Sequence, residues 1–382
     1  MNYDYLIVGA GLSGAVFAQT LAQAGHKVLI LEKRSHIGGN CFDCVDTAGV
    51  MIHRYGAHIF HTEFEDVWQY LSGFTRWRPY SHRVVCFVEG RYIPIPFNYY
   101  SLQEAFDGKA AAIQCLLEQK YGRQTKLSVL DILHSQEPML GNLAVYIYDK
   151  IFKNYTAKQW GIRVDEISPD VIARVPIYTD YDNRYFTDTY QAVPADGYTA
   201  MIQALLSDPH IELRLNTPFE SVCQFTDGII RLDGQRFNGI LIYTGRPDAL
   251  FGYRFGLLPY RSVHFEFETF AQSYYQHAPV INYPNDYNYT RIVEFKYLTG
   301  QKCPNTTICR EYPRPCQTQA DEPYYPILTP ASVRLYQLYA EQARQYDNLI
   351  LAGRLGRFQY VDMDDAVKNA LDAARTLLQC RV

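Results

Sequence analysis

The stretch Tyr3–Lys33 constrains the fold of this chain more than any other. A short apolar run leads directly into the pattern G-x-G-x-x-G, and a helix-like segment and a second apolar run ending in an acid follow. The glycines are Gly9, Gly11 and Gly14, and the acid is Glu32. In this order the glycines let the backbone approach a pyrophosphate, a helix N-terminus stabilises its charge, and the acid accepts from a ribose hydroxyl. The stretch therefore predicts an α/β fold with a Rossmann-type dinucleotide site.

The fingerprint alone leaves open whether the dinucleotide is NAD or FAD. An acid at Glu32 disfavours the 2′-phosphate of NADP. A second glycine pair, Gly38 and Gly39, follows shortly after Glu32 and gives the backbone another close approach to the cofactor. For this reason we expect FAD rather than NAD.

Composition argues against several classes of function. The 382 residues include 36 basic and 40 acidic side chains without a dense Lys/Arg cluster, so nucleic-acid binding has no electrostatic support. No apolar run approaches the length of a membrane span, and the chain enters a strand almost at once, so we expect a cytoplasmic protein. The nine cysteines fit reduced thiols, and the 33 tyrosines indicate a large polar ligand, because their rings stack and their hydroxyls donate hydrogen bonds.

Two short patterns raise the question of a metal site. Cys41 and Cys44 form a solitary CxxC, and His58 and His61 lie three residues apart. Neither pattern has the further ligands that a zinc site needs, so we predict no metal. For the histidines we expect a loop against the cofactor, and a packed histidine pair is the alternative.

A change of pattern predicts a helical domain over residues 98–165. Ser101-x-x-Glu has the form of a capping box and predicts a helix over residues 101–121, and residues 128–133 and 143–155 are expected to form further helices. The last of these has four residues at i, i+3, i+4 and i+7 on one face: Tyr148, Ile151, Phe152 and Tyr155. By spacing alone this stripe predicts a packed core.

The remaining segments predict a chain that leaves its dinucleotide domain and returns to it. Residues 260–313 alternate as antiparallel strands do, and two prolines within residues 79–97 suit an edge strand. Apolar runs at 211–215, 239–243 and 348–353 suit strands that return to the first sheet. We predict a Rossmann-like FAD-binding domain of discontinuous segments (1–78, 194–259 and 339–382), an inserted helical substrate-binding domain (98–165) and an antiparallel β-sheet domain (79–97, 166–193 and 260–338).

Nine motifs along the chain resemble those of the UDP-galactopyranose mutase family. They are GAGLSGAVFA, LEKRSHIGGN, YGAHIFHT, YTAKQWG, Arg174-Val-Pro, DGYT, NYTRIVEFKY, EPYYPI and GRLGRFQYVDMD. Each motif alone is modest evidence for the family. Nine motifs in the right order, over essentially the whole length of the chain, are specific evidence. The chain departs from the family pattern at His82, where relatives often carry a small amide or hydroxyl, at Asp196 and at Cys41. The departure at His82 leaves the exact sugar open.

The resemblance implies an isomerase that interconverts UDP-galactopyranose and UDP-galactofuranose without net redox change. In this family N5 of reduced FAD attacks sugar C1, UDP leaves, an iminium forms and the ring contracts. NAD(P)H or another reductant supplies the electrons, and we expect a homodimer. The alternatives are a mutase of the same mechanism acting on UDP-N-acetylgalactosamine or dTDP-fucose, and, in another class, an FAD amine oxidase-like oxidoreductase.

The matching motifs also imply three groups of site residues. In the catalytic group, Arg174 and Arg291 bind the diphosphate and His61 lies beside flavin N5. The cofactor-binding residues are Gly9, Gly11, Leu12, Ser13, Gly14, Glu32, Lys33, Gly38, Gly39, Asn40, His58, Ile59, Arg354, Asp362 and Met363. The substrate-binding residues are Phe152, Tyr155, Thr156, Trp160, Arg174, Tyr185, Arg291, Tyr325, Tyr360 and His82.

Overall fold

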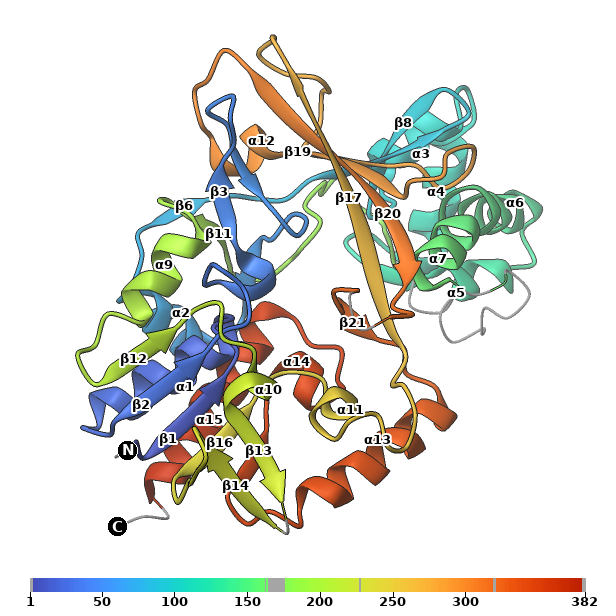
Figure 1. Ribbon diagram of the computed structural model, residues 1–382. Helices are drawn as coiled ribbons and strands as arrows, with labels where there is room; N and C mark the ends of the chain where they lie inside the picture. Colours follow the sequence, from blue (N-terminus) through green and yellow to red (C-terminus); the bar gives the residue numbers. More distant parts are fainter. Residues whose placement is uncertain (1–2, 162, 164–175, 227, 319–320, 380–382) are drawn as a thin grey trace.

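The structure is a computed structural model that describes residues 3–161, 163, 176–226, 228–318 and 321–379. An α/β unit carries both termini, and a long antiparallel sheet rises from it towards a group of helices (Figure 1). The predicted fold class, an α/β Rossmann-type unit with a helical insertion and an antiparallel sheet, is confirmed. The proposed domain boundaries stay a prediction.

The α/β unit is built on a five-stranded parallel sheet in the order β12-β2-β1-β16-β22. Its first two strands consist of apolar residues that are almost all buried, as expected for a sheet covered on both faces. The strands are β1 (Tyr5–Val8), β2 (Val28–Leu31), β12 (Ile211–Arg214), β16 (Ile240–Tyr243) and β22 (Leu349–Leu351). Segments far apart in the sequence thus form one sheet, as predicted.

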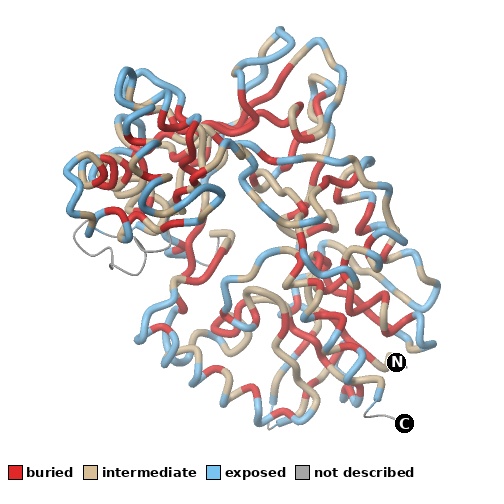
Figure 2. The backbone as a smooth tube through the Cα atoms, turned by 180° about the vertical axis from the view of Figure 1, so that it is seen from behind, coloured by how far each residue is buried: buried red, intermediate tan, exposed pale blue. Residues whose placement is uncertain are grey.

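Each face of the parallel sheet is covered by a different layer. Three helices cover one face: α1 (Leu12–Gln23), α9 (Tyr198–Leu205) and α15 (Met363–Gln379). A small antiparallel sheet packs on the other face: β13 (Cys223–Thr226), β14 (Ile229–Leu232) and β15 (Gln235–Arg236). Figure 2 shows buried backbone concentrated in the strands and in the inner sides of these layers.

The second large sheet has seven strands in the order β21-β17-β20-β19-β18-β7-β8. Its strands are β7 (Val84–Val88), β8 (Arg91–Ile95), β17 (Tyr260–Phe270), β18 (Val280–Asn282), β19 (Arg291–Glu294), β20 (Thr306–Pro315) and β21 (Tyr325–Pro326). All neighbours pair antiparallel except β7 and β18, which are parallel. The proline-containing β8 is an edge strand, as predicted.

The helical unit differs from the predicted one at two places. Its elements are α3 (Tyr99–Ala105), α4 (Ala110–Tyr121), α5 (Val129–Leu133), α6 (Pro138–Tyr146), the π-helical turn η2 (Ile147–Phe152) and α7 (Lys153–Trp160). The predicted start at Ser101 is wrong, because Asn98 is the N-cap and Ser101 is its reciprocal partner inside the helix. The predicted single helix over 101–121 is two helices. The π-turn shifts the apolar stripe, so Ile151 is buried in the helical core and Tyr155 is not part of that core.

Shorter elements connect these layers. The three-stranded sheet β5-β11-β6 consists of β5 (Phe60–Thr62), β6 (Trp77–Pro79) and β11 (Tyr190–Pro194). Two-stranded pairs are β3 (Asp43–Val45) with β4 (Met51–His53) and β9 (Lys126–Ser128) with β10 (Pro176–Tyr178). The remaining helices are η1 (Gly39–Cys41), α2 (Glu65–Ser72), α10 (Phe219–Val222), α11 (Pro247–Leu250), α12 (Phe295–Thr299), α13 (Pro330–Ala343) and α14 (Gly353–Gly356).

Candidate active site

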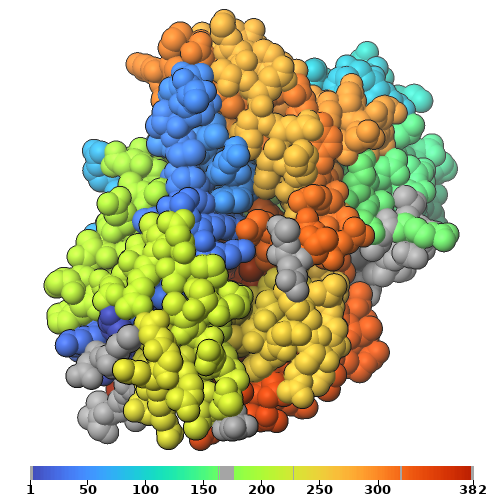
Figure 3. Space-filling model, in the orientation of Figure 1, coloured from blue at the N-terminus to red at the C-terminus, as the bar shows by residue number. Residues whose placement is uncertain are grey.

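One cavity of about 650 Å³ extends from the glycine loop after β1 to the seven-stranded sheet. Every residue predicted to bind the cofactor borders it, although these residues come from opposite ends of the sequence. On the face drawn in Figure 3, the blue N-terminal segment lies beside an orange segment from the C-terminal third of the chain. The volume lies within the range of pockets that bind small molecules and cofactors.

The cavity has two parts that differ in what lines them. We call the part lined by Gly9, Gly11–Gly14, Glu32 and Gly38–Asn40 the dinucleotide half. We call the other part the substrate half, which is lined by five side chains: His82, Tyr155, Tyr185, Arg291 and Tyr360.

Close backbone approaches shape the dinucleotide half. A Cβ atom at Gly14 would overlap the carbonyl oxygen of Gly9, so helix α1 can start directly against the strand only with glycine there. Gly11 forms a parallel β-bridge with Gly38, and a Cβ at Gly39 would come within 2.9 Å of the Gly11 Cα. Two glycine loops therefore meet and leave a shallow backbone surface for a pyrophosphate.

Glu32, directly after β2, is held in place by the backbone. Its Oε2 accepts from the Ala10 amide and its Oε1 from the Arg34 amide, both at 2.9 Å. The side chain is buried at the cavity wall. Because each carboxylate oxygen has a further lone pair, Glu32 can still accept from a ribose hydroxyl. The glycine surface and this fixed acid fit an adenine dinucleotide.

Two ion pairs that share Glu322, which we call the clasp, lie at one side of the dinucleotide half. Glu322 accepts from Lys33 Nζ at 3.1 Å and from Arg34 Nη2 at 2.7 Å. The Arg34 guanidinium also donates to Asn40 and lies 4.4 Å from the centroid of the Tyr55 ring. The clasp joins the segment before β21 to the end of β2, so it links the two parts of the chain that border the cavity.

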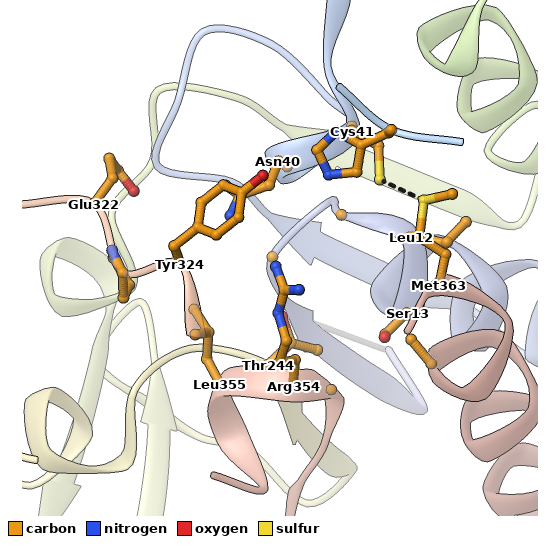
Figure 4. Close-up of a pocket in the computed structure, with 18 of the residues that line it drawn as sticks. Leu12, Ser13, Asn40, Cys41, Thr244, Glu322, Tyr324, Arg354, Leu355 and Met363 are labelled. Atoms are coloured by element: carbon orange, nitrogen blue, oxygen red, sulfur yellow. Dashed lines mark hydrogen bonds between the residues drawn. The ribbon is translucent and has the colours of Figure 1, made fainter. Parts of the chain in front are cut away.

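Arg354 enters the cavity from the short helix α14. Figure 4 shows its side chain between the Tyr324 ring and the Leu12–Ser13 loop, and its guanidinium lies 5.4 Å from the Tyr324 centroid. On the opposite wall the Cys41 thiol donates to the Met363 sulfur at 3.6 Å. Both sulfurs border the cavity, and burial raises the pKa of the Cys41 thiol to about 12, so this thiol is uncharged.

Three histidines in or near the cavity are neutral. Burial lowers the pKa of His53 to about 4 and that of His58 to about 3. His58 points Nδ1 at the Gly56 carbonyl at 2.9 Å, and its backbone amide donates to His53 Nδ1 at 3.0 Å. Burial also lowers the pKa of His82 to about 3, and its Nδ1 lies 3.1 Å from the Tyr80 hydroxyl. The loop at His58 thus borders the cavity, and the histidine against which His58 packs is His53 rather than the predicted His61.

Arg291 supplies the cation of the substrate half. Its Nε donates to Glu311 Oε2 at 2.7 Å, and the two residues face each other across β19 and β20. Because the buried Glu311 carboxylate accepts a hydrogen bond from Nε, it fixes the guanidinium at the cavity wall. The Arg291 side chain is still 28% exposed. Burial raises the pKa of both Tyr155 and Tyr185, so both phenols are neutral hydrogen-bonding groups next to this cation.

Some predicted substrate residues do not border the cavity. They are Phe152, Thr156, Trp160 and Tyr325. Phe152 packs against the helical core, and Thr156 is buried. The Trp160 ring lies 5.4 Å from Tyr325 and 6.1 Å from Tyr360, so these rings adjoin the cavity through Tyr360, which is 55% exposed. Arg174, predicted to bind the diphosphate, lies outside the described residues.

The sequence did not point to several residues that border the substrate half. Asn282 has a buried Oδ1 without a hydrogen-bond partner among the described residues, and its strand β18 pairs it with Arg291. Phe186 and Tyr324 also border the cavity, next in sequence to the predicted Tyr185 and Tyr325. Phe186 and Tyr324 could have been found in the sequence because each is next to a tyrosine of a family motif. No feature of the sequence marks Asn282.

Two family models match this chain. The model described as UDP-galactopyranose mutase matches residues 150–360, and that of an NAD(P)-binding Rossmann-like domain matches residues 7–74. The UDP-galactopyranose mutase of Mycoplasma pneumoniae is 34% identical over 99% of this chain and 97% of its own length. The chain belongs to the UDP-galactopyranose mutase family. It is therefore a flavin-dependent mutase, which is an isomerase.

Other relatives of this family member differ in their named sugar. A probable UDP-galactopyranose mutase of Klebsiella pneumoniae is 35% identical and covers 99% of this chain and 95% of its own length. The dTDP-fucopyranose mutase of Escherichia coli is 33% identical and covers 98% of each chain. Sequence identity therefore does not separate these two named activities.

The solved structures show the fold alone. Reduced UDP-galactopyranose mutase matches with a TM-score of 0.65 at 15% identity, covering 99% of this chain and 96% of that chain. A putative protoporphyrinogen oxidase from Exiguobacterium sp. 255-15 also reaches 0.65, at 15% identity and 99% coverage of both chains. Because oxidoreductases share the fold, the sequence relatives are what distinguish the mutase from the amine oxidase-like alternative.

Metal and membrane features were searched within the described part of the chain. No group of three or more His, Cys, Asp or Glu side chains there could hold a metal ion. Among the same residues, no helix combines the length and apolar character needed to cross a bilayer.

Proposed function

We propose that the chain interconverts UDP-galactopyranose and UDP-galactofuranose with reduced FAD. The observation that carries this proposal is that one continuous cavity joins a dinucleotide half to a substrate half containing Arg291 and neutral tyrosines. A dinucleotide alone would leave the substrate half without a function. A sugar nucleotide needs what this half offers, a guanidinium for its diphosphate and aromatic hydroxyls for its sugar.

The residues of the dinucleotide half fit FAD. The glycine loops would hold the pyrophosphate, Glu32 the ribose, and Arg354 with the Asp362–Met363 turn the flavin end. When bound and reduced, the flavin would supply a nucleophilic nitrogen that carries the sugar during ring contraction. Neutral His58 and the uncharged Cys41 thiol add no charge to the surroundings of that group.

The residues of the substrate half would retain the nucleotide after it leaves the sugar. Arg291 keeps its positive charge at any physiological pH, and its contact with Glu311 leaves the terminal nitrogens able to bridge phosphate oxygens. Tyr155, Tyr185 and Tyr360 can donate hydrogen bonds to the sugar or the diphosphate. Arg174 stays a predicted second diphosphate ligand.

A second candidate substrate is dTDP-fucose. The dTDP-fucopyranose mutase of Escherichia coli is about as similar to this chain as the UDP-galactopyranose mutases are. Neutral His82 borders the substrate half at the position where the family pattern is not kept. The same chemistry would then act on a 6-deoxy sugar. UDP-N-acetylgalactosamine, the homodimer, the cytoplasmic location and the NAD(P)H reductant stay predictions.

The test is turnover by the reduced flavoprotein. Dithionite-reduced protein is incubated with UDP-galactofuranose, UDP-N-acetylgalactofuranose or dTDP-fucofuranose, and the pyranose formed is followed by chromatography. We expect UDP-galactopyranose to form fastest, with less than one equivalent of reductant consumed per turnover. Conversion of none of the three, or reductant consumption in proportion to product, would contradict the proposal. Faster conversion of dTDP-fucofuranose would select the second candidate.

A further inference from the structure

The carboxylate of Asp188 lies next to the ring of His61. The Asp188 Oδ2 is 3.2 Å from His61 Nδ1, and that nitrogen is buried. The two atoms are close but not aligned as a hydrogen bond in this conformation. His61 borders the cavity, whereas Asp188 does not. Nδ1 thus faces the carboxylate, and Nε2 is the ring nitrogen left to meet a ligand.

The segment that carries Asp188 also fixes the plane of the His61 ring. Phe186 stacks on this ring with centroids 3.7 Å apart and an interplanar angle of 17°. Gln191 Nε2 donates to the backbone carbonyls of Phe186 and Asp188 at 3.1 and 2.8 Å. In the ladder between β5 and β11, Gln191 lies directly opposite His61. The ring, the phenyl group and the carboxylate are therefore held as one unit.

A second carboxylate lies near His61 but is engaged elsewhere. The Asp364 carboxyl group forms a hydrogen bond with the Thr62 side chain, and burial raises the pKa of this carboxyl group. The other nearby histidine, His82, is neutral because burial lowers its pKa to about 3. Among the described residues, the carboxylate in direct contact with the His61 ring is that of Asp188.

An ionised carboxylate can only accept a hydrogen bond, so it favours the histidine tautomer with its hydrogen on the facing nitrogen. Carboxylates behind functional histidines act in this way, fixing both tautomer and ring orientation. In His61 the facing nitrogen is Nδ1. Nε2 then carries the free lone pair of a ring that borders the cavity.

We propose that Asp188 is a positioning residue that keeps the hydrogen of His61 on Nδ1, so that Nε2 acts in the cavity as an acceptor for an N–H or O–H group. The groups available there would be the cofactor and the sugar hydroxyls, and this identification rests on the proposed function. The position of the hydrogen on His61 does not rest on it.

The direct test is the tautomer of His61 in the FAD-bound protein. Two-bond ¹H–¹⁵N spectra of protein with ¹⁵N-labelled histidine distinguish the two tautomers, and the signal lost in His61→Ala identifies His61. We expect the Nδ1–H form in the native protein and a shift towards Nε2–H in Asp188→Ala. The Nε2–H form in the native protein would overturn the proposal, even if the variant did not fold. An unchanged tautomer in a folded Asp188→Ala would overturn it as well.

A double-mutant cycle separates positioning from simple support of the fold. We expect Asp188→Ala to lower kcat about tenfold or more in the native background and to have no further effect in His61→Ala. The matched control is Glu63→Gln, because Glu63 accepts from Thr189 N and Oγ1 at 2.8 and 2.7 Å and so holds the same segment without contacting His61. A control that lowers kcat as much as Asp188→Ala, or full additivity in the cycle, would contradict positioning. Absence of mutase activity in the native protein would refute the proposed function, whereas the tautomer result would stand.

Discussion

The two halves of the cavity are built in different ways. The dinucleotide half is made by backbone: two glycine loops in contact and an acid held by two amides. The substrate half is made by side chains from strand β19, from helix α7 and from the loops before β7, before β11 and after α14. A change in the first half should therefore alter folding and cofactor retention, whereas a change in the second should alter turnover in a folded protein.

The largest expected effect is that of Gly14→Ala in the dinucleotide half. The added methyl group would overlap the Gly9 carbonyl oxygen, which cannot move without displacing β1 or α1. We expect a loss of about 3 kcal/mol or more in unfolding free energy, with loss of bound flavin. Chemical denaturation and flavin absorbance measure both.

The matched control for this change is Gly141→Ala in α6. A Cβ atom there would meet nothing within 4 Å, so stability should stay the same or rise by up to about 1 kcal/mol. If Gly14→Ala kept native stability and flavin content, the dinucleotide half would not depend on backbone contact, and the comparison would fail.

An intermediate effect is expected for Arg291→Lys in the substrate half. Lysine keeps the positive charge beside Glu311. Its ammonium group lacks the planar pair of N–H donors of a guanidinium, so it cannot bridge two phosphate oxygens. We expect kcat to fall about 100-fold, which is about 2.7 kcal/mol, with stability and flavin content nearly unchanged. Steady-state kinetics and thermal unfolding test this together.

Arg310→Lys is the control on the neighbouring strand β20. Arg310 pairs with Glu268 and does not border the cavity, so turnover should remain native. Native turnover in Arg291→Lys would remove Arg291 from the diphosphate site. Loss of flavin in that variant would show that the two halves are not separable.

The smallest effect is expected for Glu322→Gln, which weakens the ion-pair clasp at the side of the dinucleotide half. The carboxylate is 41% exposed, so solvent screens its pairs with Lys33 and Arg34, and the loss should be at most about 1 kcal/mol. We expect flavin release to accelerate by up to about fivefold, measured by the rise in flavin fluorescence, while Glu268→Gln leaves it unchanged. Equal release rates in the two variants would mean that the clasp does not contribute to flavin retention.

Local patterns predicted the elements of the dinucleotide half well, because strand, glycine turn and helix follow one another within one segment. The helical unit shows where such reasoning fails. Asn98 and Ser101 both have cap chemistry, and the choice of Asn98 depends on its contacts with the backbone of residue 182 and the side chain of Asn183. The π-turn η2 likewise cannot be read from periodicity, because periodicity assumes a regular helix.

The sequence by itself determined the glycine loops, the acid at Glu32 and the family, because these depend on residues that are neighbours in the chain or lie in ordered motifs. Only the tertiary structure decided that Asn282 borders the cavity, that Trp160 and Tyr325 stand behind Tyr360, and that Asp188 faces His61. Strand pairing between segments more than a hundred residues apart brings β5 to β11, and no local pattern records which side chains such a pairing places in contact.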